Sequence, residues 1–162
     1  MLSADSAGLF QLYSCRAPLA ALAASEVARN GNERVFKQLQ IAVQATRLAI
    51  KQRNASAVFD SNSRFHSLII ENSGNPFLVI TMARLDRLIL FYRTALLEAS
   101  IKDTAVDRYF NHLNLSAQRQ EKIAEAIEKR RPDQASDLMR RHLLQSADEM
   151  TDLLKQSEGA DL

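Results

Sequence analysis

The strongest constraint on the fold is a set of long apolar stripes with a helical period and very few residues that interrupt them. The chain has only four Gly and three Pro among its 162 residues. Its apolar side chains recur at spacings of three and four, as on one face of an α-helix. No alternating segment rich in Val, Ile and Thr is bounded by hairpin turns, so the pattern argues against strands. The sequence therefore predicts an all-α chain, an antiparallel bundle of about six to seven helices.

Turn residues and prolines set the expected helix ends. Six principal helices are expected: about 7–28, 33–51, a third that contains Asn62 and His66 and ends at Ser-Gly-Asn 73–75, then 76–99, 116–130 and 132–155. Pro18 should kink or restart the first helix, because proline lacks a backbone donor. Pro76 suits the first position of a helix.

The stretch 101–115 is the least regular part of the chain. Ser116 is a suitable N-cap, because a serine oxygen can accept a hydrogen bond from the first turn of a helix. The fifth helix is therefore expected to begin there. His112 is then interpreted as an exposed loop residue.

Composition limits the class of protein. The chain is 46% hydrophobic and 25% charged, with a formal net charge of +2, which fits one ordinary globular domain over 1–162. This charge is far from the clustered basic surplus of a chain that grips nucleic acid by itself. The single cysteine, Cys15, excludes an internal disulfide framework and a cysteine-based zinc cluster. Without an export signal or membrane span in the sequence, the expected location is the cytoplasm.

Polar residues on the apolar stripes carry the functional signal. Asn62 and His66 are four residues apart, so they share a helical face with Val58, Phe65 and Ile69. This face is apolar, so the polar pair is expected to point into the core.

Three further residues interrupt apolar stripes on other helices. Arg16, Gln120 and His142 stand at helical spacing from Leu12, Ile123 and Met139, respectively. Together with Asn62 and His66 they make five inward-facing polar side chains from four helices. Buried polar groups are costly without partners, so these five need one another, water, a metal or a ligand.

Several segments carry a family resemblance through their order and spacing. They are Leu-Tyr-Ser-Cys-Arg-Ala-Pro-Leu at 12–19, Asn-Ser-Arg-Phe-His at 62–66, Ser-Gly-Asn-Pro at 73–76, Gln-Glu-Lys-Ile-Ala-Glu-Ala-Ile at 120–127, and Asp-Gln-Ala at 133–135 leading to Met-Arg-Arg-His-Leu at 139–143. The chain resembles the C-terminal effector-binding and dimerisation domain of GntR-type bacterial transcription regulators. More narrowly, it resembles the FCD domain of their FadR subgroup. The resemblance covers nearly the whole chain.

The resemblance implies a function and partners. It implies a homodimer that binds a small carboxylate effector, with no membrane partner. In regulators of this family a winged helix-turn-helix precedes the domain and contacts DNA. The few residues before Leu9 cannot encode one, so the chain is expected to be either a fragment of a regulator or a stand-alone remnant.

The resemblance also implies a metal, held in the family by one aspartate and three histidines. By position, His66 and His142 match two of the histidines, Asn62 stands at the aspartate position and Gln120 at the remaining histidine position. Asn62, His66 and His142 are thus the candidate ligands of a divalent metal, Zn²⁺, Ni²⁺ or Mn²⁺. Asn62 brings an oxygen without a charge, and Gln120 is a poor ligand beside imidazole.

Other interpretations stay open at this stage. His66 and His142 can be hydrogen-bonded structural histidines, and Arg16 can either clamp a carboxylate or extend to the surface. A structural dimerisation bundle without ligand is the main alternative to an effector domain. A metal-dependent helical-bundle enzyme is less favoured, because no histidine belongs to a Glu-x-x-His pair. The sequence also lacks a Gly-x-Ser-x-Gly motif and a phosphate-binding glycine loop, so an enzyme is not expected.

Overall fold

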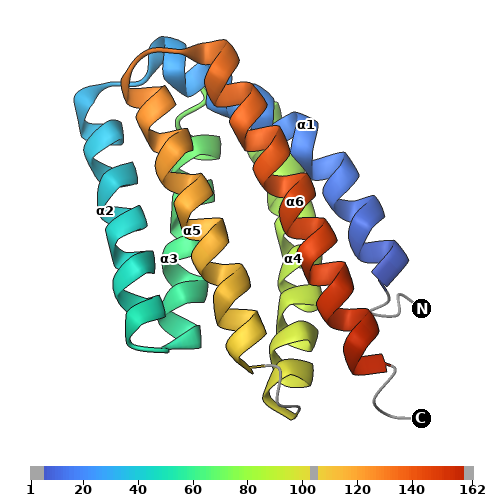
Figure 1. Cartoon of the computed structure of the whole chain (residues 1–162). Coiled ribbons are helices and arrows are strands. Elements are labelled where there is room, and N and C mark those ends of the chain that lie inside the picture. Colours follow the sequence, from blue (N-terminus) through green and yellow to red (C-terminus); the bar gives the residue numbers. More distant parts are fainter. Residues whose placement is uncertain (1–5, 103–105, 159–162) are drawn as a thin grey trace.

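Six α-helices, each antiparallel to the next, make up the fold. The computed structural model describes residues 6–102 and 106–158, and no strand occurs in these ranges. The helices are α1 (Ser6–Asn30), α2 (Glu33–Lys51), α3 (Ala55–Glu71), α4 (Pro76–Lys102), α5 (Val106–Glu128) and α6 (Pro132–Glu158). The chain passes up and down the bundle through short connections (Figure 1). The prediction of an all-α bundle is confirmed.

The first and last helices form the most extensive pair. α1 and α6 lie side by side and antiparallel, so α1 begins at the end of the bundle where α6 ends (Figure 1). On the other side, α2 packs against α3 and α5. Within the described residues no helix is both long and apolar enough to cross a bilayer.

The turn between α1 and α2 lies where the sequence predicts it, and α2 has the predicted bounds. Gly31 is required there, because a Cβ would lie only 2.6 Å from the Val27 carbonyl oxygen and 2.9 Å from the Phe36 ring. The side chain of Asn32 then caps α2 by accepting a hydrogen bond from the Val35 amide at 3.1 Å.

The turn before α4 combines a glycine, an asparagine and a proline. Gly74 has a φ of +74°, in the left-handed region that glycine adopts without strain. The Asn75 side chain accepts hydrogen bonds from the amides of Phe77 and Leu78 at 3.0 and 3.3 Å, while Pro76 takes the first helical position. The predicted start of this helix is confirmed.

Two local predictions were wrong. The fifth helix does not begin at Ser116 but at Val106, so Ser116 and His112 are helical and buried. These two polar residues face inward with Tyr109 and Leu113, and they hide the apolar period by which this turn of helix could have been recognised. In α1, the helix continues through Pro18, so the restart predicted as one of two alternatives does not occur, and the kink stays a prediction.

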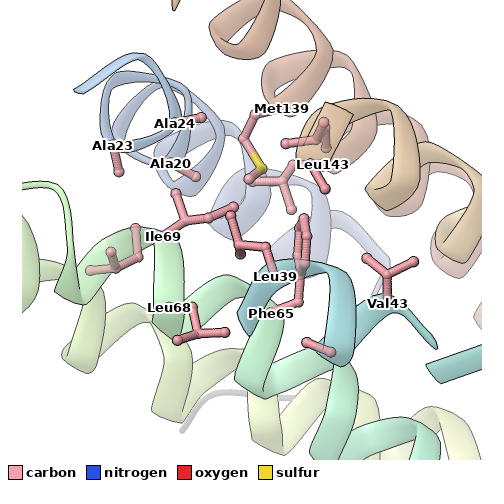
Figure 2. Packing of buried hydrophobic residues seen from close by; sticks show 14 of the residues in the cluster. Ala20, Ala23, Ala24, Leu39, Val43, Phe65, Leu68, Ile69, Met139 and Leu143 are labelled. Atoms are coloured by element: carbon pink, nitrogen blue, oxygen red, sulfur yellow. The ribbon is translucent and has the colours of Figure 1, made fainter. Parts of the chain in front are cut away.

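The hydrophobic core receives side chains from all six helices. Alanines line the inner face of α1, where their small side chains let the neighbouring helices approach closely. Figure 2 shows larger side chains meeting this face, among them Leu39, Phe65, Ile69, Met139 and Leu143. None of these five is more than 2% exposed. This core positions the inner faces of α3 and α6, which carry His66 and His142.

Candidate functional site

A cavity of about 120 Å³ lies among five of the six helices. Its polar lining comes from Tyr13 and Arg16 on α1, Asn62, Ser63, His66 and Ser67 on α3, Asp86 and Arg93 on α4, Tyr109, His112 and Ser116 on α5, and His142 and Ser146 on α6. α2 contributes none of the lining. Four of the five predicted site residues therefore face one cavity, and their roles as ligands stay predictions.

The two histidines meet across the cavity, one from α3 and one from α6. Their Nε2 atoms are 3.4 Å apart, and the rings are nearly parallel, with an interplanar angle of 11°. His66 is 6% exposed and His142 is 2% exposed. With complementary tautomers, one Nε2–H can donate to the other Nε2.

Both imidazoles are held neutral. Burial, followed by the positive charges of Arg16, His142 and Arg93, lowers the pKa of His66 well below its usual value. Burial, followed by Arg119, also lowers the pKa of His142, to about 3. At pH 7 each ring thus has one N–H and one nitrogen lone pair, and in the hydrogen bond between the rings the lone pair of one of them accepts from the other.

Asn62 and Gln120 form an amide pair beside the histidines. The Gln120 Nε2 donates to the Asn62 Oδ1 over 2.6 Å, although Gln120 is fully buried and does not line the cavity. In this orientation the Asn62 nitrogen faces Arg93, and the Gln120 Oε1 has no partner.

Turning the Asn62 amide over gives Arg93 an acceptor. Its oxygen then accepts from Arg93 Nη1 at 2.6 Å and from Nη2 at 3.2 Å, and its nitrogen faces Gln120. A matching turn of Gln120 places an acceptor oxygen against that nitrogen. Because amide oxygen and nitrogen are distinguished by their hydrogen-bond network, this second orientation is the one that the surroundings favour.

The two cavity arginines have different partners. Arg16 is 5% exposed, and its Nε donates to Asp86 Oδ1 over 3.0 Å, so the interpretation that it extends to the surface is wrong. The guanidinium of Arg93 lies 4.6 Å from the centre of the Phe59 ring. Among the described side chains, those of residues 7–95, 106–153 and 155, no carboxylate forms an ion pair with Arg93, although the negative charge of Asp86 acts on it from a longer distance.

Desolvation lowers the pKa of Arg93, but a guanidinium stays protonated in proteins. Arg93 is therefore a fixed positive charge at the wall of the cavity.

A second polar cluster adjoins the cavity between α5 and α6. The Glu149 carboxylate lies 2.5 Å from His112 Nδ1 and accepts two hydrogen bonds of 2.8 Å from Arg119. Burial alone would raise the pKa of Glu149, yet the hydrogen bonds from His112 and Arg119 lower it to about 2. In this cluster the Glu149 carboxylate of α6 contacts His112 and Arg119 of α5, and these contacts hold the two helices together.

The donor set does not fit the metal that the resemblance implies. An Nε2 separation of 3.4 Å is compatible with two ligands of one tetrahedral ion, since metal bonds of about 2.0–2.1 Å give roughly 3.3–3.4 Å. Among the described residues, however, no three His, Cys, Asp or Glu side chains gather into a metal site. The oxygen of Asn62 is taken by Arg93, a cation. The divalent metal stays a prediction that these contacts do not favour.

Sequence reasoning missed Asp86 and Arg93, because α4 is apolar on almost every side and its period does not single out an inner face. In the structure they alternate with the buried Met82 and Ile89 at spacings of three and four, which places all four on one side of α4.

Comparison with known proteins agrees with this architecture. The family model described as FCD domain matches residues 11–145. Among curated proteins, none matches the chain. The FCD family is regulatory and non-catalytic. The match covers most of the 162 residues, and the chain therefore belongs to the FCD domain family.

Proposed function

We propose that this chain is the effector-binding and dimerisation domain of a GntR-type transcription regulator of the FadR subgroup, and that it senses a small organic acid. The observation that carries the proposal is the cavity, which is lined by an arginine without a carboxylate partner among the described residues and by two neutral imidazoles. A concave site with a few convergent polar groups is the usual form of a small-molecule site.

Unsatisfied polar atoms support a ligand rather than a purely structural core. His142 Nδ1 and Ser146 Oγ stand one turn apart on α6, both buried and both without a hydrogen-bond partner. A buried polar atom without a partner costs about 1–3 kcal/mol. A bound acid, directly or through water, can supply the missing partners.

The proposed mechanism is a change in the relative positions of the helices around the cavity. An acid that contacts α1, α3, α4 and α6 together favours the arrangement in which all four reach it. A ligand with equal affinity for two arrangements would shift nothing, so the effector must prefer one of them. In a full-length regulator, operator affinity should then change with the effector. Identical operator affinity across a panel of acids would contradict this mechanism.

Thermal unfolding tests whether the domain binds acids. A ligand that binds only the folded chain at a concentration of 100 Kd stabilises it by about 2.7 kcal/mol, which raises the Tm by roughly 5–11 °C for a chain of this size. We expect such an increase with at least one small carboxylate. Ser146→Ala should reduce it, whereas Ser14→Ala, an exposed change on α1, should not. A Tm that no acid raises would instead favour a structural bundle.

Dimerisation is part of the same proposal. α4 exposes a stripe of Phe77, Ile80, Leu88 and Phe91 at spacings that keep these side chains on one face. Exposed apolar patches of this kind commonly mark protein interfaces. We place the second copy of the chain on this stripe.

Light scattering of one matched pair of variants tests the dimer. Ile80 and Ile41 are each 59% exposed, but Ile41 lies on α2, away from the stripe. Ile80→Asp should convert the dimer to a monomer, because a carboxylate would be buried in the interface without a partner. Ile41→Asp should leave the dimer intact. A dimer that persists in both variants would place the interface elsewhere.

A further inference from the structure

We infer that the cavity binds a small monocarboxylate without a metal, and that Arg93 supplies the positive charge to which the acid binds. This inference rests on the proposed function, because it names the class of acid and its principal ligand. It differs from the resemblance, which implies a metal at this place.

The charges around the cavity set the charge of the ligand. Arg16 forms an ion pair with Asp86 at 3.0 Å, and the two imidazoles are buried against each other. His112 contacts Glu149, which is not part of the lining. Among the described side chains of the lining, Asp86 is the one carboxylate and acts on both arginines, so the three groups together leave one positive charge, and Arg93 is the arginine outside the ion pair. One uncompensated positive charge calls for an anion of one negative charge.

The contacts of Arg93 prepare it for a carboxylate. The Phe59 ring covers one face of the guanidinium at 4.6 Å, and the Asn62 oxygen accepts from both terminal nitrogens. Gln120 holds the Asn62 amide in turn, at 2.6 Å. A guanidinium has five N–H donors, so an edge with unused donors stays available for a carboxylate. The two amides thus orient the arginine.

The same contacts oppose a metal. A divalent ion on the Asn62 oxygen would lie directly beside the Arg93 guanidinium, which that oxygen already contacts.

Cavity size limits the acid to a short one. A volume of about 120 Å³ is well above the roughly 10–15 Å³ needed to hold one water and well below the roughly 300–1,000 Å³ of sites for drug-sized ligands. Apolar side chains, Ile89, Leu113 and Leu143, line the cavity and can contact a short hydrocarbon tail. An outer pocket of about 190 Å³ shares Phe59 and Arg93 with the cavity, so Arg93 lies where the two adjoin.

Isothermal titration calorimetry of the whole chain with EDTA present tests the inference. The titrants are propionate, butyrate and benzoate as monocarboxylates, and succinate and citrate as acids of higher charge. We expect a monocarboxylate to bind more tightly than succinate and citrate, and EDTA to leave its affinity unchanged. Arg93→Gln should weaken binding by about tenfold or more, because a charge-assisted bidentate contact is lost. Arg87→Gln, an exposed change on the same helix, should not.

A second variant tests the charge argument independently. Asp86→Asn leaves Arg16 without its counter-charge, so the cavity then holds two positive charges. Its affinity for succinate should rise by about tenfold relative to butyrate. This result would be seen even if Arg93→Gln failed to fold, which circular dichroism would reveal.

The outcomes separate the inference from the function on which it rests. Three results would each overturn the inference: binding that EDTA abolishes and Zn²⁺ restores, unchanged binding in a folded Arg93→Gln variant, or a preference of the wild type for succinate. Each of them would still agree with the proposed function, a domain that senses an acid. If no acid binds the wild-type chain, with or without metal, the proposed function fails as well.

Discussion

Leu39→Ala is expected to lower the free energy of unfolding by about 2–5 kcal/mol. Leu39 is fully buried on α2, where its side chain lies between Phe65 and the residues of α6 (Figure 2). Truncation removes three carbons from the core and leaves a cavity that close-packed neighbours fill only in part. Urea unfolding of the wild type and the variant, followed by circular dichroism, measures the loss.

Ile41→Ala is the matched control. It removes the same number of carbons from the same helix, two residues away, but Ile41 is 59% exposed. Surface substitutions of this kind usually change stability by no more than about 0.5 kcal/mol. Equal losses in the two variants would mean that α2 does not bury the face described here.

Lowering the pH from 7 to 5 is expected to destabilise the domain by about 2 kcal/mol through His142, and further in the same direction through His66. Burial lowers the pKa of His142 to about 3 and that of His66 well below 6.5. In the unfolded chain both titrate near 6.5. Between these limits the unfolded state binds more protons, so stability falls as the pH falls below 6.5. Urea unfolding in metal-free buffer at several pH values measures the slope.

The double variant His66→Gln and His142→Gln should lose most of this slope. Glu149 does not produce it, because a carboxyl whose pKa is lowered from 4.5 to about 2 contributes stability that is lost only as the pH falls below 4.5. Unchanged stability between pH 7 and pH 5 in the wild type would contradict the buried neutral state of the imidazoles.

Much of the fold could be predicted because its signals are local. α2 begins and ends where the sequence predicts, since Gly31 and Asn32 determine the turn before it. The start of α5 could not be found in the same way. His112 and Ser116 are polar residues on an inward face, and Glu149, the partner of His112, is far away in the sequence. Only the packed structure shows that this face is buried.

The site was predicted in part for a related reason. Arg16, Asn62, His66 and His142 interrupt clear apolar stripes, so their inward direction could be inferred. α4 is apolar on almost every side, with Phe77 and Phe91 exposed and Met82 and Ile89 buried. Periodicity cannot choose the inner face of such a helix. Which amide contacts Arg93 depends on packing between three helices, which no local pattern encodes.

The pairing of α1 with α6 has a consequence during synthesis. The hydroxyl of Tyr13 on α1 donates to Met150 Sδ on α6 over 3.5 Å, across 137 positions of the chain. Both residues line the cavity. α6 leaves the ribosome after the other five helices, and contacts so distant in sequence form only once both ends are present. A nascent chain therefore has no complete cavity, and the proposed effector would bind only domains whose translation has passed α6.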